Sequence, residues 1–234
     1  MNQQFTDPDL GLITIKRHAT ATRYIFRATQ VGIQITCPAK ATMTQIRSAF
    51  ENQRAALPRL QQSLERKPKL EKGLFMKMCA FGLKISESGF GNLFQSRFTD
   101  GVLEIVCPCD TDYNRGEVQE YITKNLIRVL RYYADRYLPA RLSELAGDLN
   151  IRYGVCQVSY GRQRLGKCDS QGNIALSYRL MMLPKHLVDY VILHELTHRT
   201  EMNHGEAFHR LLDHYCEGRH RQFEKELKGF IFPI

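Results

Sequence analysis

Two segments in the first half of the chain alternate between hydrophobic and polar positions, which is the pattern of half-buried β-strands. Residues 24–36 predict one β-hairpin and residues 94–106 predict another, each with a glycine in its turn. Both hairpins end at a Cys-Pro pair, Cys37-Pro38 and Cys107-Pro108, because proline cannot donate a hydrogen bond to a continuing ladder.

Hydrophobic positions at helical spacing follow each hairpin. Residues 44–64 predict a helix that Pro58 breaks or kinks, and residues 116–149 predict a longer helix that is interrupted at Pro139. The recurrence of hairpin, Cys-Pro pair and helix is explained either by an internal repeat or by two independent uses of common motifs. We favour independent use, because hairpins followed by helices are frequent.

The last third of the chain changes from strand-like to helix-like spacing. Residues 151–160 and 173–178 predict strands, and the polar, glycine-containing residues 161–172 between them predict a loop. Pro184 suits the first position of the helix that follows. This helix is apolar over most of its surface, so we expect it to be buried. Its apolar residues are Leu187, Val188, Val191, Ile192 and Leu193.

Composition limits the range of structures that the chain can adopt. Its 234 residues and 27.1 kDa suit one large domain or a core with a small appendage. Hydrophobic residues make up 43% and charged residues 24%, so the chain can bury a core and is not wholly disordered.

The net charge of +9 is concentrated in the front of the chain. Residues 1–100 contain 15 lysines and arginines against 7 acidic residues, whereas residues 101–234 contain 18 against 17. A basic surface attracts nucleic acid through counterion release, or acidic proteins through electrostatic steering. A solvated surface without a partner is the commoner explanation of surface charge. Nucleic acid is therefore one candidate partner of the front part.

Three further features bear on where the protein works. No apolar run approaches the ~18 residues of a membrane span. Residues 1–8 lack the basic and apolar regions of a signal peptide. The seven cysteines are odd in number and include no Cys-x-x-Cys pair, which argues against a disulfide framework. These features favour the reducing cytoplasm and indicate no membrane partner.

Catalytic chemistry is indicated by the pentad His194-Glu195-Leu196-Thr197-His198 on the predicted buried helix. Residues four apart on a helix differ by ~40° in direction and ~6 Å in rise, so two such imidazoles can converge on one ion. Glu195 follows the first histidine and can face the water that a zinc ion binds and acidifies. The alternative is a helix with two surface histidines, which the apolar character of this helix disfavours.

His204 offers a third ligand if the chain turns after His198, because six residues of unbroken helix would place it on another side. Asn203 and Gly205 suit such a turn, since both tolerate the left-handed region. Glu201 is an alternative ligand; we prefer His204, because three neutral imidazoles suit zinc and leave one position open for water. Residues 206–212 then predict another helix. His209, His214 and His220 are expected at the surface or behind the site.

Polar groups before the pentad could contact the substrate. Arg162, Arg164 and Lys167 lie in the predicted loop, where a cation can stabilise the oxyanion of a tetrahedral intermediate. The hydroxyl of Tyr178 could act in the same way. A solvated loop and a packed tyrosine are the alternatives, and packing is the more common role of a tyrosine.

Four stretches resemble the YgjP-like metallopeptidases, which are related to the SprT and WLM zinc proteases. The stretches are residues 162–168, 172–177, 189–198 and 202–208. The family usually has Arg-Trp-Gly-Ser-Cys where this chain has Arg164-Leu165-Gly166-Lys167-Cys168, and Trp where His209 stands; this chain has no Trp. The resemblance implies a zincin-like α+β fold, with His194, His198 and His204 as zinc ligands and Glu195 as the catalytic base.

We therefore expect a β-rich basic part over residues 1–110 and a helical, zincin-like catalytic part over residues 111–234, either separate or as one compact domain. The leading hypothesis is a cytoplasmic zinc-dependent metallopeptidase that cleaves proteins or peptides by an activated water. One alternative is a nucleic-acid-associated protein whose zinc is structural or vestigial. Others are a protease acting on DNA-bound proteins and a hydrolase of a non-peptide amide.

Overall fold

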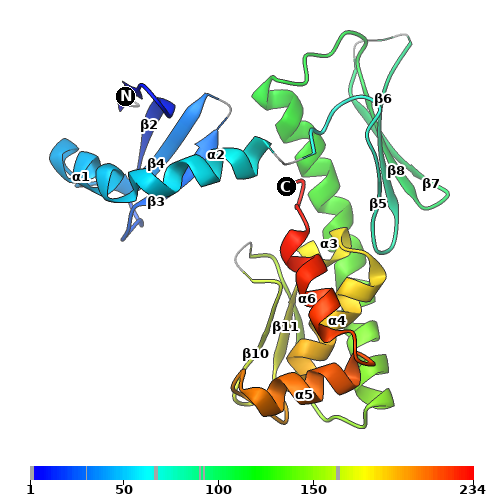
Figure 1. The fold of residues 1–234 in the computed structure, drawn as a ribbon. Helices are drawn as coiled ribbons and strands as arrows, with labels where there is room; N and C mark the ends of the chain where they lie inside the picture. Colours follow the sequence, from blue (N-terminus) through cyan, green and yellow to red (C-terminus); the bar gives the residue numbers. More distant parts are fainter. Residues whose placement is uncertain (1–2, 30, 66–67, 90, 92, 162–163) are drawn as a thin grey trace. The chain divides into compact units, whose positions relative to one another are not determined.

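The chain divides into two compact units, Met1–Pro68 and Lys69–Ile234 (Figure 1). The computed structural model describes residues 3–29, 31–65, 68–89, 91, 93–161 and 164–234. The division does not fall at the expected 110/111 boundary. The second sheet packs its buried residues into the same core as the helices that follow it, so it belongs to the second unit.

The first unit is a four-stranded sheet followed by two helices. The strands are β1 (Gln3–Asp7), β2 (Gly11–His18), β3 (Ile25–Thr29) and β4 (Gly32–Pro38). They lie in the order β1-β2-β4-β3, with the central pair β2 and β4 parallel and the outer pairs antiparallel. The predicted first hairpin is confirmed as β3–β4.

The helical segment of this unit consists of α1 (Met43–Gln53), a 3₁₀ turn (Arg54–Ala56) and α2 (Leu57–Glu65). Thr42 caps α1 through a reciprocal hydrogen-bond pair with Gln45. The predicted break is the 3₁₀ turn, which precedes Pro58. Pro58 itself lies in the first turn of α2, where a missing N–H is tolerated. Ile46 and Phe50 of α1 join the isoleucines of β2 and β4 in one core.

The second unit begins with another four-stranded sheet and a long helix. The strands are β5 (Phe75–Lys77), β6 (Gly82–Glu87), β7 (Gln95–Thr99) and β8 (Val102–Cys107), in the order β5-β6-β8-β7. The predicted second hairpin is confirmed as β7–β8. Helix α3 (Gly116–Asp148) runs through Pro139 without interruption, contrary to our prediction. Buried residues continue every four positions on both sides of the proline, so packing holds the helix together; they include Leu130, Ala134, Leu138, Leu142 and Ala146.

The two four-stranded sheets have the same strand order, and three strands of each, β2 to β4 and β6 to β8, also share their register. In both, the central strands are parallel and the same hairpin pairs with the second of them. Gln34 pairs with Thr14 and Arg27, and Glu104 pairs with Lys84 and Arg97, so equivalent residues of these three strands differ by 70 in number. The pairing of β5 with β6 is shifted by one residue relative to that of β1 with β2. The constant offset in the three strands contradicts the independent-motif interpretation that we favoured and supports an internal repeat.

A third sheet follows α3 and lies beside the pentad helix. Strand β9 (Cys156–Ser159) is parallel to β11 (Ile174–Ser177), which pairs antiparallel with β10 (Gly166–Cys168). Strand β10 lies inside the segment that we predicted to be a loop. It is three residues long and pairs only with β11, so its own sequence carries no alternation that could reveal it.

The remaining elements are a 3₁₀ helix (Tyr178–Met182) and helices α4 (Lys185–Thr197), α5 (Glu206–Tyr215) and α6 (His220–Gly229). Pro184 caps α4 from one position earlier than predicted. Helix α4 is buried as expected, and Asp189 fixes it to α3 by two hydrogen bonds of 2.7 and 2.8 Å from Arg141. The mixed α+β fold is confirmed. Among the described residues, none of the helices combines the length and hydropathy that a membrane span requires.

Candidate metal centre

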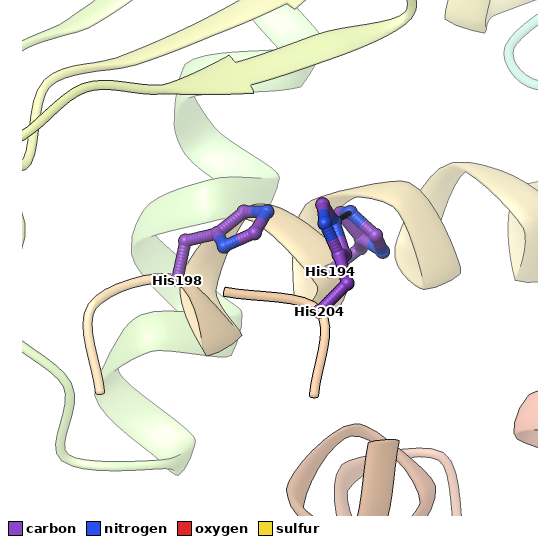
Figure 2. Close-up of side chains that lie close together, drawn as sticks. All are labelled: His194, His198 and His204. Atoms are coloured by element: carbon purple, nitrogen blue, oxygen red, sulfur yellow. Dashed lines mark hydrogen bonds between the residues drawn. The ribbon is translucent and has the colours of Figure 1, made fainter. Parts of the chain in front are cut away.

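Three imidazoles converge at the end of α4 (Figure 2). The Nε2 atoms of His194 and His204 lie 3.1 Å apart, and one ligand atom from each of the three histidines lies within 4.8 Å of the others. The ring centroid of His198 lies 5.0 Å from that of His194 and 4.7 Å from that of His204. The three histidines that the sequence selected are therefore brought together.

The local fold explains this convergence. His194 lies in the last turn of α4 and His198 at its C-cap, so the four-residue spacing keeps both on one side. His204 is placed just before Gly205, the N-cap of α5. The turn uses no left-handed residue: Gly205 has φ −80° and ψ −174°, and Asn203 is not among the described residues with positive φ. That part of our expectation was wrong.

The tautomer of His198 is set by a backbone carbonyl. Its Nδ1 lies 3.1 Å from the carbonyl oxygen of Glu201, and because a carbonyl only accepts, Nδ1 donates and Nε2 keeps its lone pair for a metal. The cluster of metal-capable side chains contains the three histidines without Glu201. Glu201 contributes through its backbone, which disfavours the alternative in which it is a ligand.

Phe208 forms an apolar wall against all three imidazoles. This fully buried ring on α5 lies 4.9, 4.7 and 4.7 Å, centroid to centroid, from the rings of His194, His198 and His204. Burial, followed by the neighbouring histidines, lowers the pKa of His194 to about 4, and burial also lowers the pKa of His204. These shifts favour the neutral form of His194 and His204, which is the form that binds a metal ion.

Glu195 is held in a narrow site between α4 and β10. Its side chain is 5% exposed, and its carboxylate accepts a hydrogen bond from the backbone N–H of Cys168. Burial raises the pKa of Glu195 to about 7, against the lowering effects of the Cys168 N–H and the charge of Arg164. A carboxyl with a pKa near neutrality is suited to take up and release a proton.

Gly166 is a site residue that the sequence did not reveal as such. A Cβ atom at this position would lie 2.3 Å from Oε1 of Glu195 and 2.8 Å from its Cγ and Cδ. The carboxylate therefore packs directly on the backbone of β10, which only glycine permits. Gly166 stands 29 positions before Glu195, and its only signal was its place in a stretch of family resemblance.

The predicted substrate-contact residues have different outcomes. Arg164 is exposed and close enough to Glu195 to lower its pKa, whereas Arg162 lies outside the described residues. Tyr178 is 1% exposed, and its ring packs near Tyr160 and under the guanidinium of Arg131. This burial agrees with the packing role that was the alternative for Tyr178; a contact of its hydroxyl with the substrate stays a prediction.

A second histidine pair lies between α5 and α6. Nδ1 of His209 lies 3.1 Å from Nε2 of His220, and the hydroxyl of Tyr190 lies 3.2 Å from Nδ1 of His220. Asp213 accepts a hydrogen bond from the backbone N–H of His220. His214 is exposed, so it is at the surface as expected.

Comparison with known proteins decides the family. A family model described as "YgjP-like, metallopeptidase domain" matches residues 22–230. The chain belongs to the YgjP-like metallopeptidase family. Members of this family are metal-dependent peptidases, so the chain is a metallopeptidase, a hydrolase that acts on proteins or peptides and requires a metal ion.

The other comparisons add little to this result. A search of curated proteins found no match to the chain. Among solved structures, the chain is similar to the metallopeptidase zymogen jannalysin of Methanocaldococcus jannaschii, with 22% identity over 39% of this chain and 98% of that chain. The TM-score is 0.33, which is too low for this likeness to bear on the site.

Proposed function

We propose that this YgjP-like protein is a zinc-dependent metallopeptidase in which His194, His198 and His204 hold the ion and Glu195 is the general base. The observation that carries the proposal is the convergence of three imidazoles beside a buried carboxylate. Neutral imidazole is a preferred zinc ligand, and three protein ligands leave one position for water or substrate.

A zinc ion at this site would supply Lewis-acid polarisation of the scissile carbonyl and would acidify the attacking water. Glu195 takes the proton of that water on its carboxylate and passes it to the departing amine nitrogen. The backbone of Gly166 and the N–H of Cys168 fix the position of this carboxylate. Phe208 excludes water from the side of the imidazoles that faces α5.

The substrate is proposed to bind along β10. Ser177 donates its N–H to the carbonyl of Leu165 at 2.8 Å, so in this antiparallel pair the backbone groups of Gly166 point away from β11. An extended peptide can pair with that edge and place its carbonyl beside Glu195. Arg164, which is exposed two residues before this strand and lowers the pKa of Glu195, is the residue that we propose to stabilise a developing oxyanion.

The test is a Glu195→Gln variant, which keeps the side-chain shape and removes the base. We expect it to retain zinc, measured by inductively coupled plasma mass spectrometry, and to cleave an unfolded protein about 10²- to 10⁴-fold more slowly. The matched control is Glu201→Gln, because Glu201 contacts the site through its backbone only. A Glu195→Gln protein as active as the unaltered chain would contradict the mechanism.

A further inference from the structure

Among the described residues of the first unit, almost all lysines and arginines lack a carboxylate partner. Its described acidic side chains are Asp7, Asp9 and Glu51, and all three pair with the single guanidinium of Arg54. The other basic residues of this unit therefore lack an ion pair with any described residue. They are Lys16, Arg17, Arg23, Arg27, Lys40, Arg47 and Arg59.

Two of these cations lie on the sheet face that α1 and α2 leave open. Ile13 and Ile33 point into the core, so the alternate positions on the same strands point to the other face. Arg27 pairs with Gln34, and Lys16 pairs with Thr36, so both cations lie on this open face and both are exposed. We call the five residues Thr14, Lys16, Arg27, Gln34 and Thr36 the open-face cluster.

The repeated sheet of the second unit shows what a neutralised version of this face looks like. There Glu104 accepts hydrogen bonds from Arg97 at 2.7 Å and from Ser86 at 2.9 Å, and pairs with Lys84 at 3.0 Å. The residue equivalent to Glu104 in the first sheet is Gln34, and the equivalent of Arg97 is Arg27. The first face has Thr14, Lys16 and Gln34 where the second has Lys84, Ser86 and Glu104, so it lacks the carboxylate that pairs the cations of the second face.

We propose that the open face of the first sheet binds nucleic acid through its phosphates. Lysine, arginine, threonine and glutamine supply the phosphate and sugar contacts in such interfaces, and they make up the whole open-face cluster. No Asp, Glu, Phe, Tyr or Trp stands at the described open-face positions of β1 to β4. The aliphatic residues of this face, Leu12 and Ile25, are half-buried and stand opposite β4 positions four residues apart, so they form no continuous apolar centre for a protein partner. Base stacking would need aromatic rings.

The binding that follows is independent of sequence and strongly dependent on salt. Each phosphate neutralised on a duplex contributes about 0.9 to the slope of log affinity against log salt, and about 0.7 on a single strand. Lys16 and Arg27, the two cations of the open-face cluster, therefore predict a slope of about −1.4 to −1.8. This surface is distinct from the proposed peptidase site, because all of its residues belong to the first unit.

The experiment is fluorescence anisotropy of the full chain with a fluorescein-labelled 24-nucleotide DNA, as a single strand and as a duplex, and with the matching RNA. Sodium chloride is varied from 25 to 200 mM. We expect Arg27→Gln and Lys16→Gln each to lower the salt slope by about 1. Gln34→Glu, which recreates the pairing of Glu104 with Arg97, should weaken binding about tenfold at low salt.

The matched control is Arg59→Gln, which removes the same charge from exposed α2 in the helical layer. It should change the affinity less than threefold, and circular dichroism and melting should show every variant folded. Equal losses in Arg59→Gln and Arg27→Gln, or an affinity that does not change with salt, would overturn the proposal. If poly-glutamate displaced the labelled nucleic acid as effectively as unlabelled DNA does, the partner would be an acidic protein, and this result would also overturn the proposal. Peptide cleavage by Gln34→Glu should be unchanged.

Discussion

Two histidine clusters lie close together in the second unit, and both contain imidazole nitrogens 3.1 Å apart. In the cluster of His194, His198 and His204, three rings converge and the outer nitrogen of His198 is occupied by a carbonyl. In the pair of His209 and His220, two rings meet, and the second nitrogen of His220 is taken by Tyr190. The distance between imidazole nitrogens therefore does not identify a metal centre. The number of converging rings that keep a nitrogen lone pair for the metal does.

The largest effect that separates the two clusters should come from removing one ring of the first. His204→Ala leaves two imidazole ligands, so we expect the purified protein to lose most of its zinc. We expect kcat/KM to fall more than about 100-fold, because mutating even a residue that only hydrogen-bonds to a metal ligand lowers metal affinity or activity 10- to 100-fold. His209→Ala is the matched control and should keep both properties. If His209→Ala lost as much zinc as His204→Ala, the pair of His209 and His220 would belong to the metal centre, and the distinction between the two clusters would be wrong.

The next effect concerns the carboxylate beside the first cluster. In Gly166→Ala the new methyl group overlaps Glu195, so the carboxylate must move by about an ångström, and we expect kcat/KM to fall about 10- to 100-fold with zinc retained. Gly161→Ala is the control, because its Cβ meets only Ser159 Oγ at an ordinary 3.6 Å. Full activity in Gly166→Ala would mean that Glu195 need not occupy this position.

The second cluster should affect stability and leave catalysis unchanged. His220→Leu leaves the buried hydroxyl of Tyr190 without its partner, and we expect a loss of about 1 to 3 kcal/mol in the free energy of unfolding, measured by urea titration. Adding Tyr190→Phe removes both partners and should restore part of the loss. A His220→Leu protein that loses zinc at native stability would assign the pair to the metal centre.

The smallest effect is a pH dependence of stability that originates in His220. Burial lowers the pKa of His220 below 6.5; His209 and Arg221 act in the same direction, and Glu224 and Asp213 oppose it. The folded state therefore favours neutral His220, so its contribution is complete above pH 6.5 and is lost as the pH falls toward the folded-state pKa. As the pH is lowered from 6.5 toward the folded-state pKa of His220, the melting temperature of the zinc-loaded wild type should fall more steeply than that of zinc-loaded His220→Leu. Parallel curves would contradict this origin.

The sequence predicted features that depend on local geometry. The pentad needs only the helical repeat to bring His194 and His198 together, and both hairpins follow from alternation and turn residues. Features set by distant contacts were missed or wrong. Strand β10 exists through its pairing with β11, and helix α3 continues through Pro139 because the turns on either side are buried.

Residue roles followed the same division. From the sequence, packing is the more common role for Tyr178, and only its burial beside Arg131 supports that alternative over a substrate contact. The role of Gly166 depends on a carboxylate from another element, and no property of a single glycine announces such a contact. The internal repeat was underestimated, although the two Cys-Pro pairs already lie 70 residues apart, because only the strand pairing shows that this offset also holds for the register.

The most direct test of the account is anomalous diffraction at the zinc edge from crystals of the protein purified without added metal. We predict one peak per chain, about 2.1 Å from a ring nitrogen of each of His194, His198 and His204, with the Glu195 carboxylate beside it. A peak between His209 and His220, or zinc bound elsewhere while the three imidazoles remain without metal, would contradict the proposed metal centre and the peptidase mechanism built on it.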